Sequence, residues 1–281
     1  MLLEAIRRKA ADAPQKFIED CQAQFCEKLD ILSHALASDS SDRPVFLLSG
    51  PSGSGKTTTA HMLKARLEKM GLTTHIISMD NYFKTFTEEE KQLFLRHELD
   101  LESPERVDGD LLSTQINDIL NGKTVKIPQY DFVTNQSRMG DETLRLHKGE
   151  IILFEGIHAL NPDVISSADD YTSRIYVSVR TRIEHPVAGE RFLLHPSKIR
   201  LARRLIRDRR ERARSFADVI ELYNSVERGE NLYIMPYKYR ADYDVDTFIP
   251  YEACVYKPSL YKFRKRFLLK HRVTIMTPGS T

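Results

Sequence analysis

The stretch that decides the fold of this chain is Gly50-Pro51-Ser52-Gly53-Ser54-Gly55-Lys56-Thr57. It fits the pattern G-x-x-x-x-G-K-[ST], in which a glycine-rich loop and a lysine hold phosphate groups. An apolar run over residues 45–48 precedes the motif and predicts a buried strand. Apolar residues at helical spacing follow it, from Ala60 to Met70, and predict a helix. Because the motif requires this strand–loop–helix order, we interpret it as a phosphate-binding P-loop.

The residue types in the loop explain how it would bind a nucleotide. Gly53 and Gly55 lack Cβ atoms, so the backbone can curl and direct several N–H groups at one anion. Lys56 can reach the β- and γ-phosphates, and the Thr57 hydroxyl can bind Mg²⁺. The following residues are predicted to bind the nucleotide: Gly50, Ser52, Gly53, Ser54, Gly55, Lys56, Thr57 and Thr58.

Composition excludes several other classes of protein. The 42 Lys and Arg residues nearly balance 40 Asp and Glu residues, so a basic site would have to be local and we expect no nucleic-acid partner. The three cysteines lack zinc-site spacing and indicate reduced thiols in a cytoplasmic protein. No apolar run approaches the roughly 18 residues of a membrane span, and the charged first residues do not resemble a signal peptide.

The chain is expected to have three parts. Residues 1–42 form a helical extension and a polar linker, residues 43–256 the P-loop domain, and residues 257–281 a basic tail. Apolar residues recur at helical spacing over residues 17–36, and this face could pack on the body of the protein or on a second subunit of a homo-oligomer. The tail could be an amphipathic helix or a basic surface patch, and the sequence leaves both open.

Further strands are predicted over residues 73–79, 151–156 and 174–179, with a fifth ending at 246–249. Their alternation with helices predicts an α/β fold with a mainly parallel sheet covered on both faces. Ligands in such folds gather at the carboxyl ends of the strands. Asp80 follows one of these strands and would lie near the γ-phosphate. Glu155 closes another, so we predict that Thr57 and Glu155 hold Mg²⁺.

Residues 87–97 and 108–120 are predicted to be helices, and strand-like runs at 124–132 and 143–146 predict a projecting β-hairpin. Tyr130 and Phe132 in this hairpin could line a pocket for a flat ligand. They could equally be ordinary core aromatics, and the pattern does not decide between the two.

Arg200–Arg214 is the most basic stretch, with eight arginines and two acidic residues. Arg200, Arg203, Arg204 and Arg207 are spaced so that a helix would place them on one face. Three interpretations are open: a solvated face, an RNA-binding helix, or a lid that closes over transferring phosphates. Arginine suits a lid because its charge is permanent and its fork is bidentate.

These segments together resemble the uridine kinase/phosphoribulokinase family of P-loop kinases, over about residues 45–252. The segments that carry the resemblance are Gly50–Thr58, Asp80–Phe83, Glu102–Pro104, Tyr130–Phe132, Glu155–Ile157 and Arg200–Arg214. The resemblance implies an ATP- and Mg²⁺-dependent phosphotransferase whose small-molecule acceptor is a nucleoside.

The resemblance also implies individual roles. Asp80 falls on the carboxylate that accepts the proton of the attacking hydroxyl and helps to hold Mg²⁺. Asp80, Lys56 and Arg203 are therefore the expected catalytic residues. The expected acceptor-binding residues are Glu102, Tyr130, Phe132, Asn135, Arg200 and Arg203. Arg207 and Arg212, with Arg214, fall on the lid over the nucleotide.

Three positions depart from the family pattern: Asn135 replaces a histidine, Glu102 an aspartate, and Asp218 a glutamine. All three lie on the acceptor side. We therefore expect phosphorylation of a nucleoside 5′-hydroxyl, and keep as an alternative a kinase of another small alcohol, such as a sugar or a pantothenate-like molecule. An alternative of another class is a nucleic-acid-binding P-loop ATPase or switch.

Overall fold

The computed structural model describes residues 2–96, 98–165, 169–187, 190–211 and 214–271. These form two compact units. The larger unit comprises Ala23–Thr181 and Leu222–Phe248, and the smaller unit comprises Met1–Gln22, Arg182–Glu221 and Ile249–Thr281. Two helices, α2 (Pro14–Asp39) and α7 (Phe216–Tyr233), run from one unit into the other. The division expected at residues 42 and 256 stays a prediction.

A five-stranded parallel sheet forms the centre of the larger unit, with the order β2-β5-β1-β6-β9. Its strands are β1 (Val45–Ser49), β2 (Thr74–Ser78), β5 (Ile151–Glu155), β6 (Thr172–Ser178) and β9 (Tyr243–Asp246). All five predicted strands are present. The fifth, β9, ends at Asp246, the first residue of the range 246–249 in which the sequence placed its end. The predicted α/β class with a mainly parallel sheet is confirmed.

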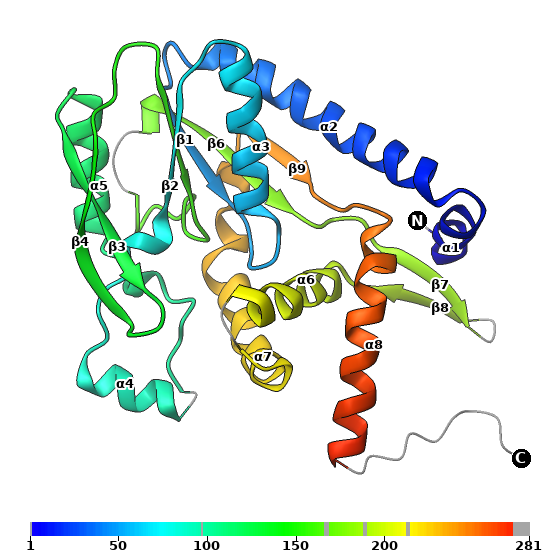
Figure 1. Cartoon of the computed structure of the whole chain (residues 1–281). Coiled ribbons are helices and arrows are strands. Elements are labelled where there is room, and N and C mark those ends of the chain that lie inside the picture. Colours follow the sequence, from blue (N-terminus) through cyan, green and yellow to red (C-terminus); the bar gives the residue numbers. More distant parts are fainter. Residues whose placement is uncertain (1, 97, 166–168, 188–189, 212–213, 272–281) are drawn as a thin grey trace, which may run out of the picture. The chain divides into compact units, whose positions relative to one another are not determined.

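Helices cover the sheet because alternate residues of each strand point to opposite faces. Val45 and Leu47 of β1 belong to one buried cluster with Leu112 and Ile116 of α5 (Gly109–Leu120). The helix after the P-loop, α3 (Lys56–Lys69), packs against β1, β2 and β5 (Figure 1). A short helix, α4 (Glu88–Leu95), begins at a capping box made by Thr87.

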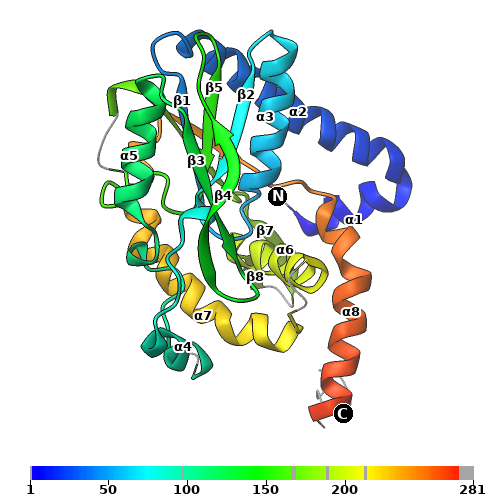
Figure 2. The same cartoon turned by 60° about the vertical axis from the view of Figure 1, so that its left-hand side comes forward.

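The predicted hairpin is present as β3 (Val125–Asp131) and β4 (Gln136–Leu144) (Figure 2). The second strand begins well before residue 143, where the sequence placed it. Of the nine residues of β4 only Gly140 and Leu144 are buried, so β4 lacks the alternating apolar pattern that would have revealed it. Gln115 of α5 connects the hairpin to the turn that follows β2, because its side chain donates to the Lys126 carbonyl at 2.8 Å and accepts from the Tyr82 hydroxyl at 2.7 Å.

The described residues of the larger unit also form four 3₁₀ turns: η1 (Met79–Tyr82), η2 (Pro104–Arg106), η3 (Asp169–Tyr171) and η4 (Met235–Arg240). The first two matter for function. η1 follows β2 at the carboxyl edge of the sheet, and Asp80 lies within it. Phe83, directly after η1, pairs with Val107, directly after η2, in an antiparallel bridge.

The smaller unit contains α1 (Leu3–Asp12), a hairpin of β7 (Ile183–Val187) and β8 (Glu190–Leu194), α6 (Pro196–Glu211) and α8 (Glu252–His271). The predicted arginine-rich helix is α6. The helical extension expected within residues 1–42 is two helices, α1 and α2, with a break before Pro14. The basic tail is helical up to His271. Within the described ranges, no helix is long and apolar enough to cross a membrane.

Candidate active site

The P-loop lies where the motif predicts it, between the central strand β1 and α3. Gly55 caps α3 with a φ of 92°, a left-handed conformation that a residue with a Cβ atom adopts only under strain. The Lys56 ammonium donates to the Gly50 carbonyl at 3.0 Å, across the loop. The Thr247 hydroxyl, just after β9, donates to the Ser54 carbonyl at 2.6 Å. The loop is thus held by its own lysine and by the segment that follows β9.

The strand register places the predicted metal-binding carboxylate beside this loop. Glu155 at the end of β5 pairs with Leu48 of β1 on one side and with Ser78 of β2 on the other. Its Oε1 accepts hydrogen bonds from the Thr57 hydroxyl at 3.0 Å and the Ser78 hydroxyl at 3.3 Å. Thr57, Ser78 and Glu155 therefore form one hydrogen-bonded group at the carboxyl edge of the sheet.

The pKa of Glu155 depends on the charges of two other predicted site residues, Lys56 and Asp80, which therefore lie near it. Burial raises the pKa of Glu155, the nearby Lys56 ammonium opposes this rise, and the nearby Asp80 carboxylate adds to it. The structure thus brings Lys56, Thr57, Asp80 and Glu155 together. Two carboxylates, a hydroxyl and an ammonium at a P-loop suit a triphosphate with Mg²⁺, which prefers oxygen ligands. The parts of the chain that the structure describes contain no group of three or more His, Cys, Asp or Glu side chains that could hold a metal ion.

Glu102, the predicted acceptor-binding acid, is buried with 7% exposure. Its loop is fixed from both sides, since its N–H donates to Asp100 at 3.1 Å and Asp100 accepts from the Tyr233 hydroxyl at 3.2 Å. Gly229 of α7 lies directly against it, because a Cβ atom added there would overlap Cβ of Glu102. The missing side chain at Gly229 is thus what allows Glu102 to pack at this depth.

Three aromatic rings form a cluster next to these loops. Phe83, Tyr130 and Phe132 contact one another edge to face, with ring centroids 5.1–6.3 Å apart. Phe132 remains 41% exposed. The loop of Phe83 pairs with the loop of Glu102, because the Lys84 N–H donates to the Arg106 carbonyl at 2.8 Å. The aromatic cluster and Glu102 are therefore held by the same pair of loops.

Asn135 has a structural role of its own. It lies in the turn between β3 and β4 with a φ of 54°, the left-handed region that asparagine tolerates better than most residues. Its carbonyl accepts from the Phe86 N–H at 3.1 Å, and its side chain accepts from the Tyr130 hydroxyl at 3.5 Å. Asn135 thus lies beside the aromatic cluster.

His158, three residues after Glu155, is a buried residue that the sequence analysis did not select. It is 1% exposed, and burial lowers its pKa from 6.5 to about 4, with a further lowering by the Lys56 charge. Neither ring nitrogen has a hydrogen-bond partner within normal geometry among the described residues. The backbone groups of Glu102 and Tyr233 lie near the ring and partly offset this lowering of the His158 pKa. His158 is therefore a neutral imidazole in the region of Lys56 and Glu102.

The predicted arginines of α6 belong to the smaller unit. Arg200 is buried, Arg203 forms an ion pair with Glu252, and Arg207 donates to Asp208 at 2.7 and 2.9 Å. Arg212 lies outside the described residues. How α6 approaches the P-loop is part of the proposal below.

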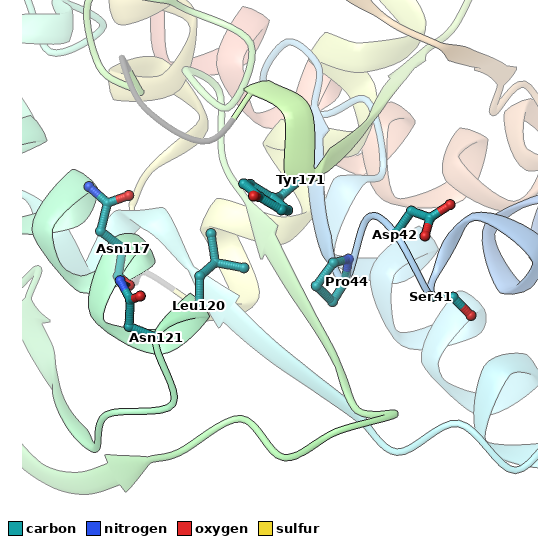
Figure 3. A pocket seen from close by; sticks show the side chains of 7 residues that line it. All are labelled: Ser41, Asp42, Pro44, Asn117, Leu120, Asn121 and Tyr171. Carbon is teal, nitrogen blue, oxygen red and sulfur yellow. Dashed lines mark hydrogen bonds between the residues drawn. The ribbon is translucent and has the colours of Figure 1, made fainter.

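A separate pocket of about 450 Å³ lies at the opposite edge of the sheet (Figure 3). Pro44 and Tyr171 in its lining precede β1 and β6, whereas the P-loop follows β1. None of the predicted site residues lines this pocket.

Comparison with known proteins identifies the family. Residues 45–250 match the model of the Phosphoribulokinase / Uridine kinase family. The chain belongs to this family. The predicted class of enzyme, an ATP-dependent phosphotransferase, is confirmed by this membership and by the relatives that follow.

One similar relative is a uridine kinase of Staphylococcus haemolyticus, 34% identical over 201 residues that cover 69% of this chain and 83% of that protein. Another is a uridine kinase of Schizosaccharomyces pombe, 35% identical over 177 residues. That match covers 63% of this chain but only 34% of the fission-yeast protein. Among solved structures, a protein of Silicibacter sp. TM1040, described provisionally as a fructose transport system kinase, has a TM-score of 0.55. It is 18% identical, and the likeness covers 77% of this chain and 98% of that one, so it shows the fold alone.

Proposed function

We propose that this protein transfers the γ-phosphoryl group of MgATP to the 5′-hydroxyl of a nucleoside. The observation that carries the proposal is the pairing of two loops at the carboxyl edge of the sheet. One loop carries Asp80 and Phe83, the other carries the buried Glu102, and the hairpin adds Tyr130. A carboxylate suits the hydroxyls of a ribose, and an aromatic cluster suits the flat face of a base.

In this proposal each residue near the P-loop has a distinct task. Lys56 and the loop N–H groups bind the phosphates, while Thr57, Asp80 and Glu155 hold Mg²⁺, which neutralises charge on the phosphates when it is bound. Asp80 accepts the proton of the attacking hydroxyl. The transition state of phosphoryl transfer is largely dissociative, so positioning and charge neutralisation contribute most of the rate.

We also propose, as the family resemblance implies, that the arginines of α6 act as a lid. Arg203 and Arg207 would stabilise charge on the transferring group, with Arg200 near the acceptor. The contacts of α6 weigh against an RNA-binding face, because Arg200 is buried and Arg203 and Arg207 are each paired with an acidic residue of the same unit. A nucleic-acid-dependent ATPase would instead show hydrolysis that RNA stimulates without any small acceptor.

Glu102 and Asn135 would set acceptor preference. A site built to bind a polar group rejects analogues that leave its buried partner unpaired. We therefore expect ribonucleosides to be preferred over 2′-deoxyribonucleosides. Asn135 offers a different donor and acceptor pattern from the histidine of the family, so discrimination among bases should be weaker. Replacing Asn135 by histidine should improve the use of uridine or cytidine.

A screen of nucleosides, sugars and polyols for acceptor-dependent ADP formation tests the proposal. We expect ribonucleosides to give the highest kcat/KM. Because Glu102 and Asn135 differ from the residues of the family pattern, a second candidate function remains, that of a kinase of another small alcohol. That candidate would replace the first if a sugar or polyol were phosphorylated and no nucleoside were.

A further inference from the structure

The guanidinium of Arg203 is clamped by a carboxylate outside the segment that matches the family. Nε of Arg203 donates to Oε2 of Glu252 at 2.7 Å, and Nη2 donates to Oε1 at 2.9 Å. The two side chains are 14% and 6% exposed. Bidentate geometry at this depth is unlike a surface ion pair, because both groups have lost most of their water.

Glu252 is itself held from two more directions. It begins α8, and its carboxylate accepts from the Tyr256 hydroxyl at 3.2 Å and from the Ile249 N–H at 3.3 Å. The family match ends at residue 250, so the clamp comes from a helix that follows the matched segment. Both α6 and α8 belong to the smaller unit and contact each other (Figure 1).

This geometry fixes the orientation of the guanidinium plane. A guanidinium has five N–H donors in a rigid fork, and Glu252 accepts two of them along the Nε–Nη2 edge. Fixing one edge fixes the direction of the opposite edge, which carries Nη1. An arginine held in this way has lost its rotational freedom before any phosphate arrives, which is the general advantage of a pre-organised site.

We propose that Glu252 is a positioning residue that orients Arg203 for phosphoryl transfer, which makes the first turn of α8 part of the catalytic apparatus. The inference rests on the proposed kinase function, in which Arg203 stabilises the transferring group. Loss of the clamp should therefore lower kcat and leave the KM values for ATP and acceptor largely unchanged.

A double-mutant cycle on kcat tests this inference, with Glu252→Gln, Arg203→Ala and the double variant. Misplacing a catalytic group by about 1 Å can cost roughly 10²-fold, and we expect a fall of that order for Glu252→Gln. The double variant should be no slower than Arg203→Ala, because Glu252 acts only through Arg203. Glu252→Asp keeps the charge, retracts it by one methylene, and should give an intermediate kcat with an unfolding temperature near that of the wild type. Glu221→Gln, an exposed change in the same unit, is the matched control and should leave kcat unchanged.

Each other outcome has a definite meaning. Three outcomes would overturn the positioning role. The losses in kcat could multiply in the double variant, Glu252→Asp could be as fast as the wild type, or Glu252→Gln could have a higher kcat than the wild type. A wild-type protein that phosphorylates only a sugar or polyol would remove the nucleoside assignment, and the same cycle measured with that acceptor would still decide the role of Glu252. A wild-type protein inactive with every alcohol would overturn both.

Discussion

Oγ1 of Thr57 donates a hydrogen bond of 3.0 Å to Oε1 of Glu155. This bond joins the first turn of α3 to the end of β5, two elements separated by about a third of the chain. It orients two of the three oxygen ligands that the proposal assigns to Mg²⁺.

Replacing Thr57 by valine keeps the shape of the side chain and removes its hydroxyl. We expect the Mg²⁺ concentration for half-maximal activity to rise by roughly 10–100-fold, the usual cost of disturbing groups that hold or orient a metal ligand. Thr57→Ser, which retains the hydroxyl, is the control and should need little more Mg²⁺ than the wild type. A magnesium titration of both variants makes the comparison, and equal requirements would remove Thr57 from the metal site.

Asp80 should matter for turnover more than for nucleotide binding. Asp80→Asn keeps the size of the side chain but cannot accept a proton, and general-base contributions are typically about 10²–10⁴-fold. A loose transition state favours the lower part of this range. Steady-state kinetics should show the loss in kcat, while the affinity for ATP measured by calorimetry should change little. An unchanged kcat would exclude Asp80 as the base.

Gly229→Ala should weaken the acceptor site without weakening the helix. Alanine is the better helix former by about 0.5–1 kcal/mol, so a loss of function cannot come from poorer helix propensity. The added methyl group would overlap Cβ of Glu102 and displace it. We expect a higher acceptor KM and an unchanged KM for ATP, as for Glu102→Ala. Asn224→Ala, an exposed change on the same helix, is the control.

His158 should make the folded protein sensitive to acid. Burial lowers the pKa of His158 from 6.5 to about 4. As pH falls below 6.5 the imidazole is protonated in the unfolded chain, whereas in the folded state it is protonated only near pH 4. Stability should therefore fall as pH drops through this window, by roughly 3 kcal/mol in total.

Denaturant unfolding of the wild type and of His158→Leu between pH 7 and pH 4 isolates this contribution, because the other titrating groups are common to both proteins. The wild type should lose more stability than the variant over this range. Parallel pH dependences would mean that His158 is not buried as a neutral imidazole.

The sequence was sufficient to predict the parallel sheet, the P-loop and the position of Asp80 and Glu155. These features depend on local patterns: an apolar run that ends in a polar residue is visible without knowing its neighbours. The convergence of Thr57, Asp80 and Glu155 followed from the rule that parallel strands present their carboxyl ends at one edge.

Other features depend on contacts between distant residues and left no local signal. Nothing in the sequence marks Gly229 as the neighbour of Glu102, or Glu252 as the partner of Arg203. Ser78 lies within a predicted strand and His158 shortly after another, but only the strand register and the burial identify them as part of the site. The extent of β4 was missed because its exposed, polar residues carry no apolar alternation.

The central claim, transfer to a nucleoside 5′-hydroxyl, is tested most directly by comparing uridine with 5′-deoxyuridine. Both present the same base and the same 2′- and 3′-hydroxyls, and only uridine has the proposed acceptor oxygen. We predict that uridine supports ADP formation and that ³¹P NMR identifies a 5′-monophosphate as the product. We predict that 5′-deoxyuridine does not support ADP formation and instead inhibits the reaction of uridine competitively. A phosphorylated product from 5′-deoxyuridine, or phosphorylation of a sugar or polyol but of no nucleoside, would contradict the account.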